Sequence, residues 1–147
     1  MPTNTSSSKV HFHFLKGANS LSNRTRLKSF IVSLFKKEGI KLENIDYIFC
    51  SDDYLLEINR QHLQHDYYTD IITFELSNPG EPVNAEVYIS IDRVKDNARQ
   101  FNTALKEEIH RVIFHGALHL CGYKDKKSKD QELMRKMENK YLGLYFR

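Results

Sequence analysis

The sequence predicts an α/β domain in which a four-stranded mixed sheet, with three parallel strands and one antiparallel edge strand, packs with about five helices. The first reason is the order of hydrophobic periods: strand, helix, strand, helix, two strands and three helices. The second is the short turn between the third and fourth strands, because strands so closely linked pair antiparallel. Helical crossovers make the other pairings parallel. The 147 residues contain no repeat and no linker, so we expect one domain over 9–147 after a disordered polar tail, 1–8.

The first strand and the first helix follow from two different hydrophobic periods. Residues Val10–Phe14 alternate with period two, which is typical of a strand with one buried face. From Asn23 the period becomes helical, and Gly39 ends this helix because glycine readily adopts a positive φ. The apolar face of the helix consists of Leu27, Phe30, Ile31, Leu34 and Phe35.

The middle of the chain supplies the rest of the sheet. Ile45–Phe49 is the expected second strand, and Ser51 caps the helix that follows it. The segment 71–74 is rich in β-branched residues and forms the third strand. After turn residues at 78–80, the alternating segment 87–91 forms the fourth strand.

Three helices are expected after the sheet. Asp92 caps the first, which reaches about Phe101, and a long helix spans about Leu105–Cys121. Ser128 and Gln131 have the spacing of a capping box at the start of the last helix. The expected buried stripe of that helix consists of Leu133, Met137, Tyr141 and Leu144.

Composition argues against some classes of protein and favours others. No apolar run approaches the ~20 residues of a membrane helix, and the N-terminus lacks the apolar core of a signal peptide. Two cysteines make no disulfide framework, so we expect the cytoplasm. The net charge of +3 is uneven: residues 93–147 carry 13 basic and 7 acidic side chains, and residues 1–92 carry 9 and 12. This basic C-terminal third indicates a polyanionic partner.

Two histidines four residues apart predict a metal site on the long helix. His115 and His119 lie one turn apart, so both imidazoles project to the same side. Gly122 can end the helix with a positive φ, and Asp125 then returns toward the same point. Three such ligands with one open position are typical of a catalytic Zn²⁺, one per chain. Mn²⁺ and Ni²⁺ accept the same ligand types.

The motif also permits two alternative interpretations. Histidines at this spacing often serve only packing and hydrogen bonding. The motif is also similar to the metzincin pattern of zinc proteases, but Gly116 stands where those enzymes carry a glutamate. Because that glutamate is their general base, its replacement argues against a peptidase.

Three segments resemble the YbeY family, the bacterial endoribonucleases of ribosomal RNA maturation. Residues 115–125, HGALHLCGYKD, resemble the family signature H-G-x-L-H-L-x-G-Y-D-H. Asn59 and Arg60, with TDIITF at 69–74, resemble its N-R…T-D-V-L-S-F block, and AEVYIS at 85–90 resembles its G-D-I-x-I-S strand. The resemblance implies an α/β fold, a zinc ion, a cytoplasmic ribosome-linked role and single-stranded RNA as substrate.

The sequence departs from this family pattern at two places. The family's third metal histidine falls on Asp125, and its aspartate falls on Lys124. Aspartate is itself a zinc ligand, so the resemblance still implies a metal held by His115, His119 and Asp125. A basic residue that the family uses in RNA cleavage falls on Leu63, and leucine cannot hold a phosphate.

Other cations are candidates for that missing role. Arg111 precedes His115 by one turn and either binds a phosphate through its guanidinium or pairs with Glu107. His65, two residues after Leu63, is a second candidate for catalysis beside the two metal histidines. The lysines expected to hold the RNA backbone are Lys124, Lys126, Lys127 and Lys129.

The leading prediction is a metal-dependent, single-strand endoribonuclease in ribosomal RNA maturation, at the 3′ end of 16S rRNA, and in ribosome quality control. Residues 9–147 then form a single metal-hydrolase domain with single-stranded rRNA and the small ribosomal subunit or its proteins as partners, without membrane or DNA. Leu63 favours a first alternative, an assembly factor that binds rRNA or a ribosomal protein without cleavage. A second alternative, a zinc peptidase or small-molecule hydrolase, lacks its glutamate at Gly116. No residue is assigned as general base.

Overall fold

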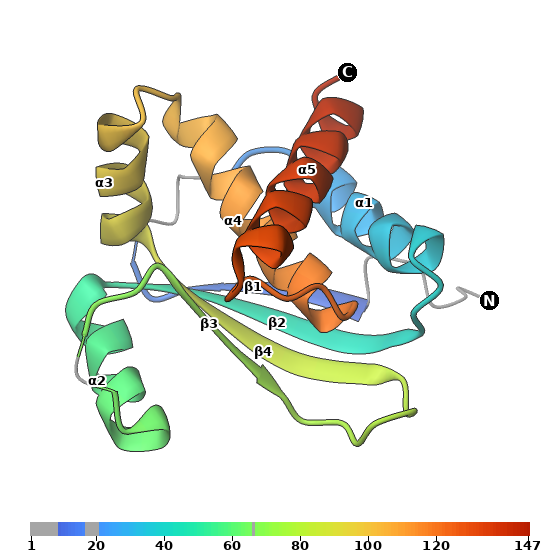
Figure 1. Ribbon diagram of the computed structural model, residues 1–147, viewed down its shortest axis with the longest axis horizontal. Coiled ribbons are helices and arrows are strands. Elements are labelled where there is room, and N and C mark those ends of the chain that lie inside the picture. The colour runs from blue at the N-terminus through green and yellow to red at the C-terminus, as the bar shows by residue number, and fades with distance from the viewer. Residues whose placement is uncertain (1–8, 17–20, 66) are drawn as a thin grey trace.

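The computed structural model describes residues 9–16, 21–65 and 67–147, so the predicted tail, 1–8, lies outside the described residues. The elements follow the predicted order (Figure 1). They are β1 (Val10–Phe14), α1 (Arg24–Lys37), β2 (Leu42–Cys50), α2 (Asp52–Leu63), β3 (Ile71–Glu75), β4 (Val83–Ser90), α3 (Ile91–Gln100), α4 (Leu105–Leu120) and α5 (Ser128–Tyr145).

A mixed sheet with the strand order β1-β2-β4-β3 forms the centre of the fold. β1, β2 and β4 are parallel, with Tyr47 of β2 opposite Val87 of β4. β3 lies at the edge and is antiparallel to β4, with Thr73 opposite Val87. The predicted fold class, three parallel strands and one antiparallel edge strand packed with helices, is therefore confirmed.

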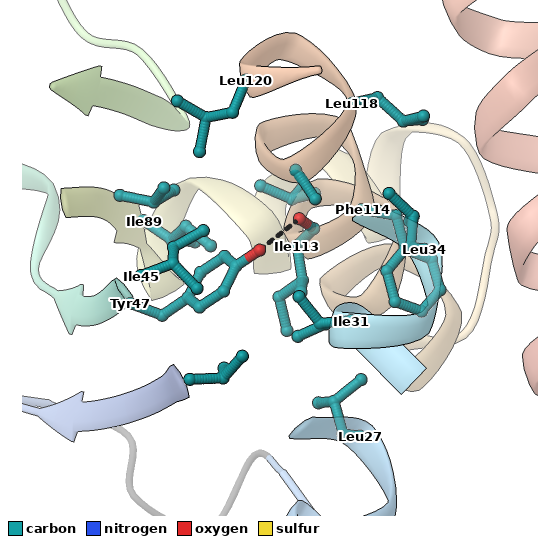
Figure 2. Packing of buried hydrophobic residues seen from close by; sticks show 14 of the residues in the cluster. Leu27, Ile31, Leu34, Ile45, Tyr47, Ile89, Ile113, Phe114, Leu118 and Leu120 are labelled. Carbon is teal, nitrogen blue, oxygen red and sulfur yellow. Dashed lines mark hydrogen bonds between the residues drawn. The ribbon is translucent and has the colours of Figure 1, made fainter. Parts of the chain in front are cut away.

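The main core lies between the sheet and the helices α1, α3, α4 and α5, which cover the same face (Figure 1). Figure 2 shows Tyr47 entering this layer from β2, where its buried hydroxyl donates a hydrogen bond of 3.1 Å to the carbonyl of Ile113 on α4. Leaving such a hydroxyl without an acceptor costs about 1–3 kcal/mol. The bond therefore holds α4 against the middle of the sheet.

The helix α2 lies against the other face of the sheet (Figure 1). Its apolar side packs on a smaller buried cluster formed by Cys50, Leu55 and Ile72. Ser51 caps the helix as predicted, because its hydroxyl accepts a hydrogen bond of 3.1 Å from the backbone N–H of Tyr54. The helix ends at Leu63, immediately before a segment that reaches the candidate site.

The helix α4 approaches the sheet closely at Gly116. A Cβ at this position would lie 3.0 Å from Cδ1 of Ile71 and 3.1 Å from Cγ1 of Val87. A larger side chain at this position, such as the glutamate that a zinc protease carries here, would therefore have to displace Ile71 or Val87. The close approach also places the neighbouring His115 beside the first residue of β3, with which it shares a cavity.

Asp92 does not cap its own helix, so this prediction was wrong. The helix α3 begins at Ile91, and its N-cap is Ser90, whose hydroxyl accepts a hydrogen bond of 3.1 Å from the N–H of Arg93. The carboxylate of Asp92 instead accepts a bond of 2.8 Å from the N–H of Asp52, the first residue of α2. The error arose because the apolar alternation continues through Ile91, although β4 ends one residue earlier.

The start of α5 and one residue of its predicted buried stripe differ from the prediction, whereas Tyr141 is buried as predicted. The described chain shows no side-chain cap for this helix: Lys127 is the N-cap residue and Ser128 already belongs to the helix, so the predicted capping box does not form. Leu133 is 47% exposed, whereas Met134 is 2% exposed and faces the core. The buried face consists of Met134, Glu138, Tyr141, Leu142 and Tyr145. Glu138 thus brings a carboxylate into a largely apolar stripe.

Two further observations concern the helices and the cysteines. Within the described ranges, no helix is both long enough and apolar enough to cross a bilayer. Cys50 and Cys121 are free thiols, and burial raises the pKa of each to about 12. Both thiols therefore stay protonated near neutral pH and are poor nucleophiles or metal ligands.

Candidate functional site

His115 and His119 of α4 line a cavity of about 260 Å³ at the edge of the sheet. The other walls come from β3, from the end of α2 with the segment after it, and from the loop between α4 and α5. Asp125 and Lys126 of that loop and His65 of the segment after α2 also line the cavity. The fold therefore brings all three predicted metal ligands and two further predicted residues to one place.

The turn after α4 places Asp125 beside His115. Gly122 has a φ of 109°, which favours glycine, and its N–H donates a hydrogen bond of 3.0 Å to the carbonyl of His119. The N–H of Tyr123 also bonds back to the last turn of α4, so the chain reverses directly after the helix. Oδ2 of Asp125 then lies 3.1 Å from Nε2 of His115.

A buried carboxylate on α5 contacts the other nitrogen of the same ring. Nδ1 of His115 lies 2.7 Å from Oε2 of Glu138, whose side chain is 7% exposed. Both ring nitrogens therefore face carboxylates, whereas a neutral imidazole carries one proton and donates to one acceptor only. The second nitrogen then needs either a second proton or a metal cation between itself and its carboxylate.

The charges around His115 favour a positive species at this position. Burial alone lowers the pKa of the ring, but the hydrogen bond to Glu138 and the negative charges of Glu138, Asp125 and Asp70 outweigh it, so the pKa is raised above 6.5. A metal ion at Nε2 takes the place of one proton and meets the same need for positive charge. The electrostatics of the site therefore fit a divalent cation.

His119 is the third residue of the predicted ligand set. It is exposed and lies on the wall of the cavity that His115 and Asp125 also line. Within the part of the chain that the structure describes, no group of three or more His, Cys, Asp or Glu side chains is arranged so that it could hold a metal ion. Two imidazoles and a carboxylate on one cavity match the ligand types of a catalytic zinc ion, so the donors fit in kind.

Arg111 lies beside the histidine cavity rather than in its wall. Nη1 of Arg111 donates to Oε1 of Glu138 at 3.1 Å, and Nη2 lies 3.9 Å from Glu107. The ion pair with Glu107 is thus present, but the shorter contact is the one with Glu138. The guanidinium is 13% exposed and lines a neighbouring cavity of about 860 Å³, which His115 also borders.

The segment after α2 brings two rings to the 260 Å³ cavity. The rings of His65 and Tyr67 stack with their centroids 5.2 Å apart, and the Tyr67 hydroxyl lies 3.0 Å from Nδ1 of His65. Leu63 lines the same cavity and is 40% exposed. An apolar side chain therefore occupies the place where the family resemblance predicts a cation.

The predicted lysines are not equivalent in their positions. Lys126 lines the 260 Å³ cavity. Lys124 lines a separate cavity of about 450 Å³ together with Glu38, and Lys127 is the exposed N-cap of α5. Of these three, Lys126 is therefore the one best placed to meet a phosphate beside the histidines.

Two glutamates that support the site were not predicted from the sequence. Glu138 contacts His115, and the one clue to it was an acidic residue in line with the apolar side of α5. Glu38, just after α1, accepts hydrogen bonds from the hydroxyl of Tyr123, at 2.8 Å, and from that of Tyr141. The bond with Tyr123 anchors the loop that carries Asp125, and the bond with Tyr141 ties Glu38 to α5. No local pattern reveals a contact between residues 85 positions apart.

The α/β domain places two histidines, an aspartate and a lysine around one cavity at the sheet edge, and hydrolases use residues of these types. Comparison with known proteins identifies the family: a family model described as "Endoribonuclease YbeY" matches residues 15–145. The chain belongs to the YbeY family of endoribonucleases. The resemblance inferred from three sequence motifs is thereby confirmed.

Individual relatives agree with this assignment. The protein named Endoribonuclease YbeY from Cytophaga hutchinsonii is 48% identical over 124 residues, which are 84% of this chain and 87% of that protein. The one from Bacteroides thetaiotaomicron is 52% identical over 106 residues, 72% of this chain and 77% of that protein. The solution structure of a Thermotoga maritima protein matches with a TM-score of 0.66 and 29% identity, over 93% of this chain and 89% of that one.

Family membership decides between the classes of function that the sequence left open. It supports an enzyme that hydrolyses RNA over an assembly factor that only binds it, although Leu63 stands at the family's basic position. It also agrees with the tight packing at Gly116, where the glutamate of a zinc peptidase would have to displace Ile71 or Val87.

Proposed function

We propose that this chain is a metal-dependent endoribonuclease that hydrolyses phosphodiester bonds in single-stranded ribosomal RNA. One observation carries the proposal: two histidines, an aspartate and a lysine line a single cavity in a chain whose relatives are named endoribonucleases. The ligand types favour a divalent cation, and the lysine favours a phosphate beside it.

The residues that would hold the metal are His115, His119 and Asp125, with Zn²⁺ as the first candidate and Mn²⁺ or Ni²⁺ as alternatives. A divalent ion bound there supplies a Lewis acid that polarises a phosphoryl oxygen and makes a nearby water more acidic. His119 is exposed, so its side chain is free to turn toward the other two ligands.

The remaining residues of the cavity bind and orient the RNA. Lys126 attracts the phosphate backbone, because its ammonium group lies on the wall that also carries the histidines. The stacked rings of His65 and Tyr67 present an aromatic surface on which a base can stack. Leu63 adds apolar surface but no charge, so Lys126 takes over the role of the family's basic residue.

The proposed substrate is ribosomal RNA, at the 3′ end of 16S rRNA, in maturation and in ribosome quality control. The small ribosomal subunit or its proteins are the proposed partners, and DNA is not a proposed substrate. The lysines of the α4–α5 loop and the start of α5 contact phosphates largely without reading sequence, so a partner is needed to direct the cut. Free thiols suit the reducing cytoplasm, which is the proposed compartment.

The experiment is the substitution His119→Ala, followed by metal analysis and an RNA cleavage assay on the same preparation. We expect both the bound metal and cleavage of single-stranded rRNA to be lost. His62→Ala is the matched control, because His62 is an exposed histidine of α2 on a different cavity. Cleavage that persists after the metal is lost contradicts the proposed mechanism.

A further inference from the structure

We propose that Glu138 is the positioning residue of the site: it fixes the orientation and the tautomer of His115, and Arg111 holds it in place for this role. The expected effect of Glu138 on metal affinity rests on the proposed function. Its effect on the tautomer of His115 does not depend on any metal. Neither Glu138 nor its pairing with Arg111 was expected from the sequence.

Glu138 lies at the centre of a chain of contacts between α4 and α5. Its Oε2 contacts Nδ1 of His115 at 2.7 Å, and its Oε1 accepts a hydrogen bond of 3.1 Å from Nη1 of Arg111. Arg111 and His115 stand one turn apart on α4, so a single carboxylate from α5 bridges both. Each carboxylate oxygen therefore has a different partner on α4.

Two guanidinium groups pair with the carboxylate of Glu138. Nη1 of Arg111 lies 3.1 Å from Oε1, and Nη1 of Arg135 lies 3.8 Å from the same oxygen. An ionised carboxylate only accepts hydrogen bonds, so Nδ1 of His115 must carry the proton that it shares with Oε2. This assigns the Nδ1–H tautomer to the neutral ring.

In this tautomer the lone pair of Nε2 of His115 is free and faces the cavity. Asp125 competes for the ring proton from the other side, at 3.1 Å and with a side chain that is 40% exposed. The contact with Glu138 is shorter, at 2.7 Å, and its carboxylate is 7% exposed, so water screens it less. The ring proton therefore stays on Nδ1, where it is shared with Glu138. Nε2 carries no proton, so it faces the cavity as a potential metal ligand and not as a hydrogen-bond donor to Asp125.

The substitution Glu138→Gln tests this directly. The guanidinium of Arg111 can only donate, so the new amide must turn its oxygen to Arg111 and its NH₂ group to His115. Nδ1 then has to accept, and the proton moves to Nε2. In chelator-treated protein at a pH where the ring is neutral, ¹⁵N NMR should report the Nδ1–H tautomer in the wild type and the Nε2–H tautomer in E138Q.

The metal affinity of the same variant gives a second readout. Because a proton on Nε2 must be displaced before a metal can bind, Zn²⁺ affinity should fall about 10–100-fold in E138Q. Glu107→Gln is the matched control, since it makes the same chemical change at another carboxylate that pairs with Arg111, 3.9 Å away and 48% exposed. E107Q should keep the wild-type tautomer and affinity.

The tautomer of His115 can be measured in the wild type, so the proposal can be tested even if E138Q does not fold. A neutral His115 in the wild type with its proton on Nε2 overturns the proposal, as does an unchanged tautomer in a folded E138Q. The NMR readout needs neither metal nor RNA. If the tautomer switches as expected and the protein binds no metal, the proposed function fails and the role of Glu138 in orienting His115 stands.

Discussion

Nε2 of His115 lies 3.1 Å from Oδ2 of Asp125, although the two residues are 10 positions apart and belong to a helix and to the loop that follows it. The contact exists because Gly122 reverses the chain directly after α4. The geometry of the site therefore depends on where the sheet holds α4 and on what anchors the loop.

The affinity for a metal should keep rising with pH beyond the pH at which it levels off for an ordinary histidine site. A proton and a metal compete for Nε2 of His115, and the pKa of this ring is raised above 6.5 because its contacts with Glu138 and Asp125 outweigh the opposing effect of burial. Zn²⁺ titrations from about pH 6 to about pH 9 should show affinity still increasing well above 6.5. An affinity that levels off below that pH contradicts this prediction.

Gly116→Ala should destabilise the fold and disturb the site. The added Cβ meets Ile71 and Val87 at 3.0 and 3.1 Å, and overpacking of this kind costs about 1–3 kcal/mol in the free energy of unfolding, more than the ~0.5–1 kcal/mol by which alanine favours the helix. Gly143→Ala on α5 is the control, because nothing lies within 4 Å of its added Cβ and alanine favours a helix by about 0.5–1 kcal/mol. Urea unfolding should give opposite signs for the two variants, and equal effects would contradict the role of the close contact.

Glu38→Ala should loosen the loop that carries Asp125. Tyr141 is buried and donates its hydroxyl to Glu38, so removing the carboxylate leaves a buried donor unpaired at about 1–3 kcal/mol. Tyr123 loses the 2.8 Å bond that raises its pKa to about 12. We expect lower stability in urea and faster amide exchange over residues 121–127. Glu43→Ala, an exposed glutamate on β2, should change neither.

His110 should make the protein less stable in mild acid. Burial lowers the pKa of His110 below 6.5, and its Nε2 is buried with no hydrogen-bond partner among the described residues. In the unfolded chain His110 takes up a proton near pH 6.5, whereas in the folded chain it does so only at lower pH. The free energy of unfolding therefore falls as the pH drops from about 6.5 toward the lower pKa of the folded state.

The variant His110→Leu isolates this effect from the other titrating groups. His115 acts with the opposite sign, since its pKa is raised in the folded state. The stability of the wild type minus that of H110L should therefore be larger at about pH 7.5 than at about pH 5.5. A difference that is the same at both pH values contradicts the assignment to His110.

Leu63→Arg should strengthen RNA binding. The side chain lines the cavity beside the histidines, so a guanidinium there can reach a phosphate next to Lys126. One additional phosphate contact on a single strand should steepen the dependence of log Kd on log salt by about 0.7. Leu76→Arg, at an exposed leucine outside this cavity, is the control and should give a smaller change in slope. Equal slopes for both variants contradict the placement of RNA in the cavity.

The order of elements could be predicted because each depends on short-range patterns. The period-two alternation of Val10–Phe14 and the turn between β3 and β4 are properties of a few neighbouring residues. The exact ends of the elements could not be predicted in this way. Ser90 and Asp92 are both good helix caps, and only packing decides between them. On α5, Leu133 and Met134 are both apolar, and the docking of the helix selects Met134 for the core.

In the candidate site, too, local spacing could be predicted from the sequence, whereas contacts between separate helices could not. His115, His119 and Asp125 share one helix and the loop after it, so their spacing alone predicted that they converge. Glu138 reaches His115 from another helix, and this contact depends on how α4 and α5 pack. The same packing turns Arg111 toward Glu138, which its spacing from His115 did not reveal.

Elemental analysis of the purified wild type beside Asp125→Ala is the most direct test of the central claim. The three proposed ligands predict about one divalent metal ion per chain in the wild type and a large loss in D125A, because Asp125 supplies one of three protein ligands. A wild-type protein that contains no metal, or a D125A variant that retains all of it, would contradict the assignment of His115, His119 and Asp125 as a metal site.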